Sequence, residues 1–183
     1  MEINYRQVIN EINEVLQTSN FTNTAHFVNK IIDSRKIVVF GAGRVGLIMK
    51  TFSMRLNHLN LASNYLGEVS TPNTGKGDLL IVASGSGNTK STLSICEIAK
   101  ANNLDVICIT SNDSSKIVKL SSSYILLNCQ TKETESKDRK SIQPMTTLFE
   151  QSLLIFLDSL VLNLMHVTNE SHESMLSRHN VIE

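Results

Sequence analysis

Residues 79–92 read LLIVASGSGNTKST, and three kinds of local structure follow one another within them. The apolar run Leu79–Ala83 has the length and branching of a buried strand. Small residues with hydroxyl groups come next, and from Ser91 to Lys100 apolar residues recur at helical spacing. A strand that turns on glycines directly into a helix brings free N–H groups and the positive end of the helix dipole to one point. The stretch therefore predicts an anion site.

The loop between this strand and this helix favours a phosphomonoester as the anion. Gly85 and Gly87 allow the backbone to approach a ligand, and Ser84, Ser86 and Thr89 can donate further hydrogen bonds. The loop does not match the P-loop pattern, because Thr89 and not a glycine precedes Lys90-Ser91, which argues against a nucleoside triphosphate. The alternative is an ordinary turn that caps a helix, but two Ser-Gly pairs exceed what capping needs.

Composition indicates one globular domain with a balanced surface charge. The 183 residues are enough for a single domain with a sizeable core, and 41% of them are hydrophobic. Lys and Arg number 17 and so do Asp and Glu, so extensive contact with nucleic acid or an anionic membrane is disfavoured. We therefore expect a small-molecule ligand, no nucleic acid and no membrane.

Cysteine usage and the N-terminal residues favour a cytoplasmic location. Cys96, Cys108 and Cys129 stand singly among apolar neighbours and are typical of reduced core residues. The first residues contain no apolar leader. The longest apolar segment, residues 148–165, is interrupted by two carboxylates and two amides, and we expect it to be too polar for a membrane span.

Strands and helices alternate after residue 36, which predicts a parallel sheet covered by helices, with right-handed crossovers. Two amphipathic helices occupy residues 3–33, the α/β core spans 36–129, and a long helix with a polar tail spans 143–183. The expected strands lie at 36–40, 61–66, 79–83, 105–110 and 124–129. We expect the long helix to begin near Pro144, because proline suits the first helical position.

A second glycine-rich turn, GAGRVG at residues 41–46, follows the first strand. It matches a dinucleotide fingerprint, but Asn64 stands where that fingerprint needs an acidic residue, so a nicotinamide cofactor is disfavoured. Ligands bind at the carboxyl ends of parallel strands, so this turn and the serine-rich loop can converge on one pocket. We expect Gly41 and Gly43 to form a wall of that pocket and Arg44 to reach an anion, unless Arg44 is only a solvated residue.

Glu150 is the candidate general base. If its helix begins at Pro144, Glu150 lies about two turns in, where the helix dipole does not explain a carboxylate. Its apolar neighbours favour a half-buried side chain, and a carboxylate in such surroundings is a candidate for proton transfer. The alternative is a surface glutamate at a gap in the apolar face.

The five histidines predict no metal site, because no two of them are four residues apart and no cysteines accompany them. His179 lies in a tail that has little reason to be ordered unless it docks on a partner. The long C-terminal helix is apolar around most of its circumference, and such a helix is usually covered on more than one side. A second subunit that packs on the terminal helices would provide this cover.

Taken together, these motifs resemble the sugar-isomerase (SIS) domain family, and within it the 6-phospho-3-hexuloisomerase branch. The likeness runs from about residue 5 to the C-terminus. The matching segments are Gly41–Arg44 with Gly46-Leu47, Phe52–Leu56 with His58-Leu59, Gly67-Glu68 with Thr71-Pro72, Ser84–Gly87 with Thr89–Ser91, and Ser141–Met145 with Leu148–Gln151.

The resemblance implies a three-layer α-β-α sandwich around a five-stranded parallel sheet, usually in a homotetramer, and no cofactor. It implies conversion of arabino-3-hexulose 6-phosphate to fructose 6-phosphate, the second step of formaldehyde fixation through ribulose monophosphate. Glu150 would be the base, acting through a cis-enediol(ate), and His179 could act from a neighbouring subunit. The phosphate-binding residues carried over by position are Ser84, Gly85, Ser86, Gly87, Asn88 and Thr89.

Several positions depart from the pattern of the family. Val45 replaces a common serine, Asn88 replaces an acidic residue, Thr146 replaces a common glycine, and the residues around His179 differ from the usual tail. These changes leave the phosphate site and the base intact but bear on sugar specificity. Two other hypotheses therefore stand beside the hexuloisomerase: an isomerase of another sugar phosphate, such as arabinose 5-phosphate, and a non-catalytic module that binds a sugar phosphate.

Overall fold

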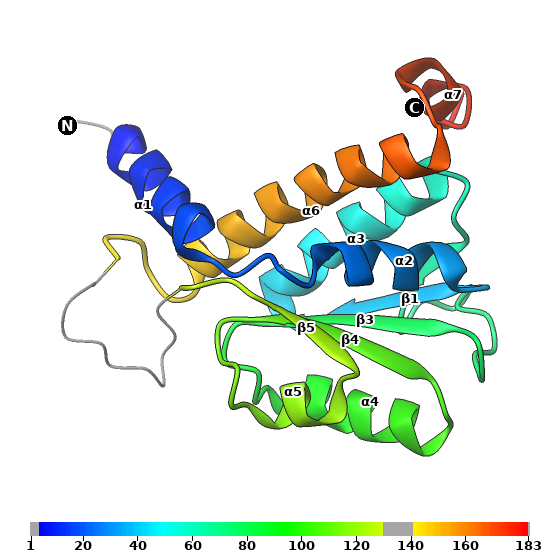
Figure 1. Ribbon diagram of the computed structural model, residues 1–183, viewed down its shortest axis with the longest axis horizontal. Coiled ribbons are helices and arrows are strands. Elements are labelled where there is room, and N and C mark those ends of the chain that lie inside the picture. The colour runs from blue at the N-terminus through cyan, green and yellow to red at the C-terminus, as the bar shows by residue number, and fades with distance from the viewer. Residues whose placement is uncertain (1–3, 130–140, 183) are drawn as a thin grey trace.

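The computed structural model describes residues 4–129 and 141–182, and its centre is a five-stranded parallel sheet (Figure 1). Every neighbouring pair of strands is parallel, in the order β2-β1-β3-β4-β5. The strands are β1 (Ile37–Gly41), β2 (Ser63–Tyr65), β3 (Leu79–Ser84), β4 (Asp105–Thr110) and β5 (Ser123–Leu126). The predicted five-stranded parallel sheet is confirmed, with ends that differ from the expected ones by a few residues.

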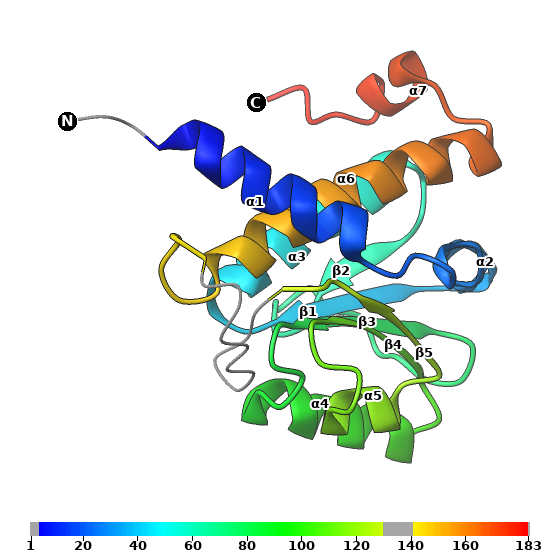
Figure 2. The same cartoon turned by 60° about the vertical axis from the view of Figure 1, so that its left-hand side comes forward.

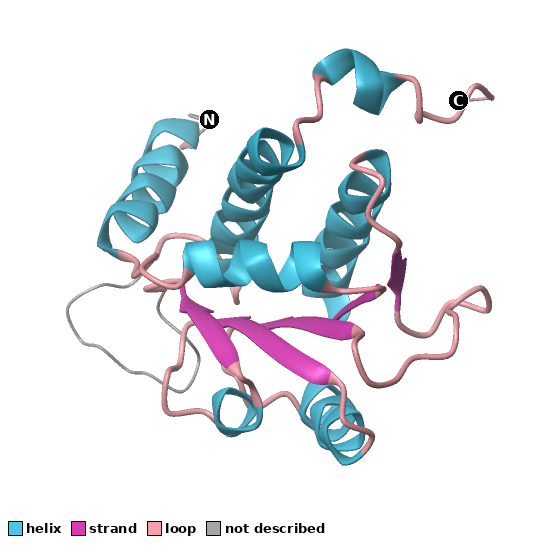
Figure 3. Ribbon diagram, turned by 45° about the vertical axis from the view of Figure 1, so that its right-hand side comes forward, coloured by secondary structure: helices cyan, strands magenta, loops and turns pink. Residues whose placement is uncertain are grey.

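Helices cover both faces of the sheet and complete the three layers (Figure 3). One face carries α4 (Lys90–Ala101) and α5 (Lys116–Leu120), and the other carries α2 (Thr24–Asp33), α3 (Gly43–His58) and α6 (Thr147–Thr168). The remaining helices are α1 (Tyr5–Thr18) and α7 (His172–Leu176). Helix α1 packs on α6, and α7 follows α6 near the C-terminus.

Successive side chains of a strand point to opposite faces of the sheet, so the buried strand residues divide into two core clusters. Ile81 and Ile107 point toward α2, α3 and α6, whereas Leu80 and Val82 point toward α4 and α5. All six residues of β3 are buried. A strand buried on both faces has a near-continuous apolar sequence, which is why β3 was recognisable from sequence.

The start of α6 differs from the expectation. The helix begins at Thr147 and not at Pro144, because Met145 has a φ of 59° and breaks the regular backbone. The Pro144 carbonyl instead accepts a hydrogen bond from the Thr147 N–H at 3.2 Å. Glu150 therefore lies in the first turn of α6, where the helix dipole favours a carboxylate, and the prediction that it lies two turns in is wrong.

Helix α6 is also more apolar than the sequence argument allowed. By length and composition alone, Thr147–Thr168 is long and apolar enough to cross a membrane, so the expectation that it is too polar does not hold. The same test is passed by core helices of soluble proteins, and half of the apolar window is buried inside this structure. Its apolar character is explained in part by the core residues Leu153, Leu157 and Leu160, which pack among the other helices of this layer.

The three cysteines are buried and unpaired, as expected for core residues. Burial raises the pKa of the Cys96 thiol to about 12 and that of Cys129 to about 11. Burial raises the pKa of the Cys108 thiol as well. Because the thiolate is the reactive form, none of these side chains is a good nucleophile near neutral pH.

A charged contact joins α2 to the start of β4, and it yields a test of the fold. Asp105 accepts hydrogen bonds from the Lys30 ammonium and, at 2.5 Å, from the Ser122 hydroxyl. Burial by itself would raise the pKa of Asp105, but the bonds from Lys30 and Ser122 outweigh it and hold that pKa below its ordinary value of 3.8. A lowered carboxyl pKa adds stability above the unfolded value, and this stability is lost as the pH falls through the folded value.

We predict that Asp105→Asn lowers the free energy of unfolding by about 1 kcal/mol near neutral pH. The deficit should shrink as the pH falls below about 4, because the wild-type carboxyl then becomes protonated too. Urea unfolding at neutral and acidic pH measures both effects. Asp113→Asn, at an exposed position before α5, is the control and should change little. An equal deficit at both pH values would contradict the assigned role of Asp105.

Candidate active site

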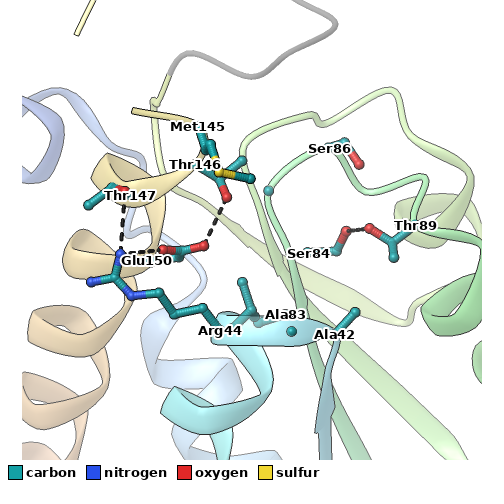
Figure 4. Close-up of a pocket in the computed structure, with 13 residues that line it drawn as sticks. Ala42, Arg44, Ala83, Ser84, Ser86, Thr89, Met145, Thr146, Thr147 and Glu150 are labelled. Atoms are coloured by element: carbon teal, nitrogen blue, oxygen red, sulfur yellow. Dashed lines mark hydrogen bonds and ion pairs between the residues drawn. The ribbon is translucent and has the colours of Figure 1, made fainter. Parts of the chain in front are cut away.

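A pocket of about 440 Å³ lies at the carboxyl ends of β1 and β3 (Figure 4). Three segments far apart in the sequence line it: residues 42–45 after β1, residues 83–86 with Thr89 between the end of β3 and the start of α4, and residues 145–147 with Glu150 at the start of α6. The two glycine-rich turns therefore converge on one pocket, as predicted. The third side, from α6, places a carboxylate opposite the serine-rich loop.

Three helices begin at this pocket. Their N-cap residues, Ala42 of α3, Thr89 of α4 and Thr146 of α6, form no side-chain cap to their own helix. The first N–H groups of each helix are therefore not satisfied by its N-cap side chain. Because the positive ends of three helix dipoles meet here, the pocket suits a ligand with a compact negative charge.

The serine-rich loop is held in shape by its own hydrogen bonds. The Ser84 hydroxyl lies 3.0 Å from the Thr89 hydroxyl and accepts the Gly87 N–H at 3.1 Å. Ser86 accepts the N–H of Asn88 at 3.2 Å. Neighbouring β4 also holds the loop, because the Gly85 carbonyl accepts the Ser111 N–H at 3.0 Å. Contacts within the protein thus give the loop its shape.

Two glycines of the predicted site have packing roles outside the pocket lining. Gly87 has a φ of 64°, and a Cβ there would lie 2.2 Å from the Ser115 hydroxyl oxygen before α5. Gly41 ends β1, where a Cβ would lie 2.8 Å from Cγ1 of Val45. Glycine at both positions permits a close approach of backbone to neighbouring elements. Gly43, with a φ of 59°, and Gly85 line the pocket as expected.

Glu150 is buried at the edge of the pocket with only 7% of its surface exposed, so the alternative of a surface glutamate is wrong. One carboxylate oxygen, Oε2, lies 3.0 Å from Nη1 of Arg44. The other, Oε1, accepts a hydrogen bond from the Thr146 hydroxyl at 2.9 Å. Arg44 also donates to the Thr147 hydroxyl at 3.3 Å. These contacts fix the orientation of the carboxylate, as Figure 4 shows.

The structure brings most of the predicted site residues together. The residues that line the pocket are Gly43, Arg44, Ser84, Gly85, Ser86, Thr89 and Glu150. Arg44 is not merely a solvated residue, because its guanidinium pairs with Glu150. Gly41, Gly87 and Asn88 do not line the pocket. The side-chain oxygen of Asn88 instead accepts the Lys116 N–H at 3.2 Å, which ties the loop to α5.

Within this chain, His179 lies away from Glu150. Its ring is 5.5 Å from the ring of His58 between centroids, close to the C-terminal end of α3. The preceding Arg178 fixes this position, because it donates to the His58 carbonyl at 2.7 Å and pairs with Glu170 at 2.8 Å. The two residues beside it, Arg178 and Asn180, border a second pocket of about 430 Å³ that shares no residue with the first.

Met145 and Thr147 were not recognised as lining residues, because the sequence pattern places residues 145–147 inside a helix, and Thr146 was expected only to bear on sugar specificity. One signal could have found them: Thr147-x-x-Glu150 has the spacing of a capping box, which marks a helix start. Among residues 4–129 and 141–182, no three His, Cys, Asp or Glu side chains gather as metal ligands do.

Comparison with known proteins finds a matching family model and relatives that cover nearly the whole chain. The model of the SIS domain family matches residues 30–158. A 3-hexulose-6-phosphate isomerase of Bacillus subtilis is 35% identical over 177 residues, which cover 97% of this chain and 96% of that protein.

Solved structures share the fold. The crystal structure of a hypothetical protein from Methanococcus jannaschii, which infers a molecular function of 3-hexulose-6-phosphate isomerase, has a TM-score of 0.84 at 32% identity and covers 98% of both chains. The NanR protein of Vibrio vulnificus, complexed with ManNAc-6P, has a TM-score of 0.79 at 16% identity, over 97% of this chain and 66% of that one. At this lower identity the likeness shows the fold alone.

The backbone conformation of Gly87 leads to a prediction about the serine-rich loop. Gly87→Ala should lower the free energy of unfolding by about 2 kcal/mol or more, because of its left-handed backbone and the contact with Ser115. Urea unfolding measures the loss, and stabilisation by inorganic phosphate should also weaken. Gly75→Ala is the matched control, since a Cβ there meets no atom within 4 Å and should cost little. Equal stability of the two variants would contradict the packing role.

Proposed function

The chain belongs to the SIS domain family and is a sugar-phosphate isomerase, and we propose that it interconverts arabino-3-hexulose 6-phosphate and fructose 6-phosphate. The observation that carries this proposal is the buried, oriented carboxylate of Glu150 across one pocket from the serine-rich loop. Such an isomerase needs an anchor for a dianion, one base, and donors for a developing oxyanion. The pocket supplies a candidate for each.

The phosphate of the sugar would bind at the Ser84–Thr89 loop. The hydroxyls of Ser84, Ser86 and Thr89 lie at the start of α4, and the N-terminus of α3 begins on the same pocket. A phosphate far from the reacting carbons supplies binding energy that orients the sugar. Gly87 and Asn88 contribute to this site by shaping the loop, and Gly41 contributes by placing α3.

Glu150 would move the proton. The carboxylate takes the proton from C2 of the 3-ketose, and the electrons of the broken C–H bond form a cis-enediolate between C2 and C3. A proton then passes from the C2 hydroxyl to the C3 oxygen, and the same carboxyl group returns its proton to C3, which leaves the ketone at C2 in fructose 6-phosphate. The exchange needs no external oxidant or reductant, so no cofactor is required. Arg44, 3.0 Å from Glu150, is placed to stabilise charge that develops on the enediolate oxygen.

We further propose a homo-oligomer, a tetramer by analogy with the family, in which His179 serves the site of a neighbouring subunit. Two observations support this arrangement. Within its own chain, His179 lies beside His58 and away from Glu150. In addition, α1 and α6 expose large apolar side chains, among them Ile9 at 57% and Leu162 at 66%. Exposed apolar side chains on terminal helices are suited to an interface between subunits.

Two other candidates are an isomerase of another sugar phosphate, such as arabinose 5-phosphate, and a module that binds a sugar phosphate without turnover. Val45 lines the pocket without the hydroxyl that the family commonly has, and Thr146 gives Glu150 a hydrogen bond that a glycine cannot make. A panel of five- to seven-carbon sugar phosphates separates these candidates. Stabilisation by fructose 6-phosphate without turnover on any of them would favour the binding module. For the preferred reaction, we also propose that the protein catalyses the second step of formaldehyde fixation through ribulose monophosphate and that it acts in the cytoplasm.

We predict that Glu150→Gln lowers kcat by about 10²- to 10⁴-fold while the affinity for fructose 6-phosphate changes little. Glutamine keeps an oxygen for the Thr146 hydroxyl but cannot accept the proton. An assay coupled to a hexulose-phosphate synthase, with fructose 6-phosphate as the reported product, measures the rate. Glu97→Gln, exposed on α4, is the control. Full activity in Glu150→Gln would contradict the assigned mechanism.

Hybrid oligomers test the proposed role of His179. Glu150→Gln and His179→Asn should each be nearly inactive alone, whereas co-expressed subunits should regain measurable turnover. In such hybrids an intact Glu150 from one subunit meets an intact His179 from its neighbour, as a symmetric interface allows. Activity that stays at the level of the single variants, in hybrids shown to form, would place both residues in one chain.

A further inference from the structure

The segment that leads into α6 is fastened to α1 by a single carboxylate. Glu11 accepts three hydrogen bonds from this segment: the Ser141 hydroxyl at 2.7 Å, the Ile142 N–H at 2.8 Å and the Gln143 side-chain amide at 3.0 Å. Figure 2 shows α1 lying across α6, on the same side as this segment. Residues about 130 positions apart in the sequence are thus joined where the chain enters the active site.

The carboxylate is itself well anchored. Its neighbour Ile12 and the next-turn Val15 are buried, and α1 packs along α6. Burial by itself would raise the pKa of Glu11, but the hydrogen bonds from Ile142, Gln143 and Ser141 together hold it below its ordinary value of 4.5. Glu11 is therefore charged near neutral pH, and a charged acceptor makes stronger hydrogen bonds than a neutral one.

A second set of hydrogen bonds joins the next residues of the segment to Glu150. The Pro144 carbonyl accepts both the N–H and, at 2.7 Å, the hydroxyl of Thr147. Met145 holds a left-handed backbone with a φ of 59°, a strained conformation that persists only where its surroundings impose it. Thr146 then donates its hydroxyl to Glu150 at 2.9 Å. The position of Glu150 thus depends on where residues 141–147 are held.

From these contacts we propose that Glu11 is a positioning residue for the active site, which fixes residues 141–147 so that Thr146 can orient the Glu150 carboxylate. The proposal rests on the proposed function, since it assigns Glu150 the part of the base. Glu11 does not line the pocket, so it acts through the segment that it holds. The serine-rich loop is held by β4 and α5 instead, so phosphate binding is independent of Glu11.

The first test separates rate from binding. Glu11→Ala should lower kcat about tenfold or more, because a small displacement of the base costs much rate, while the affinity for inorganic phosphate changes by less than about twofold. Glu11→Gln, which keeps one acceptor oxygen, should lose less. Glu14→Ala, exposed on the same helix, is the matched control. Unchanged kcat in Glu11→Ala, or an equal loss in Glu14→Ala, would overturn the proposal.

The second test does not need turnover. Amide hydrogen exchange at residues 147–150 should become about tenfold faster in Glu11→Ala, whereas exchange at residues 90–93 should not change. If the wild-type protein isomerises no sugar phosphate, the proposed function fails, yet this measurement still decides the role of Glu11. Exchange at 147–150 that equals the wild-type rate would overturn it.

A third variant tests whether the effect of Glu11→Ala comes only from a general loss of structure in α1. Gln143→Ala removes one of the same hydrogen bonds from the side of the segment and leaves α1 intact. It should reproduce part of the loss of kcat, again with unchanged affinity for phosphate. If Glu11→Ala does not fold, this variant carries the test alone. A Gln143→Ala protein with wild-type kcat and wild-type exchange would then contradict the proposal.

Discussion

The parallel register that sets Gly41 of β1 beside Ala83 of β3 is the constraint on which the pocket depends. The chain passes from β1 to β2 on one side and from β3 to β4 on the other, so the order of the strands reverses between β1 and β3. Parallel sheets bind ligands at such a switch point, because the two loops that leave it diverge and open a crevice. Here both loops lead into helices, so two helix N-termini face that crevice.

Helix α6 adds a third N-terminus and, in its first turn, the carboxylate of Glu150. A carboxylate and a phosphate dianion in one pocket repel each other, and the repulsion is strong where water is excluded. The N-terminus of α6 and the guanidinium of Arg44 offset it, since both place positive charge beside Glu150. In the proposed site, the same three helix starts that would attract a phosphate therefore also make it possible to keep a buried carboxylate nearby.

The serine-rich loop and the α6 side of the pocket have separate supports. The loop is fastened to β4 and α5 through Gly85 and Asn88, whereas Glu150 depends on the segment that Glu11 holds. In the proposed site, a substitution on the α6 side, as at Thr146, would leave the contacts that hold the serine-rich loop unchanged.

The sequence by itself determined the strands, the two glycine-rich turns and the residue types of the site, because β3 is apolar throughout and glycines mark the turns. Tertiary structure decided what pattern could not. The start of α6 depends on the backbone of Met145, the pairing of Arg44 with Glu150 joins two helices, and Asn88 faces α5 instead of the pocket. Periodicity reports only on neighbours along the chain, whereas these contacts arise between segments that the sheet brings together.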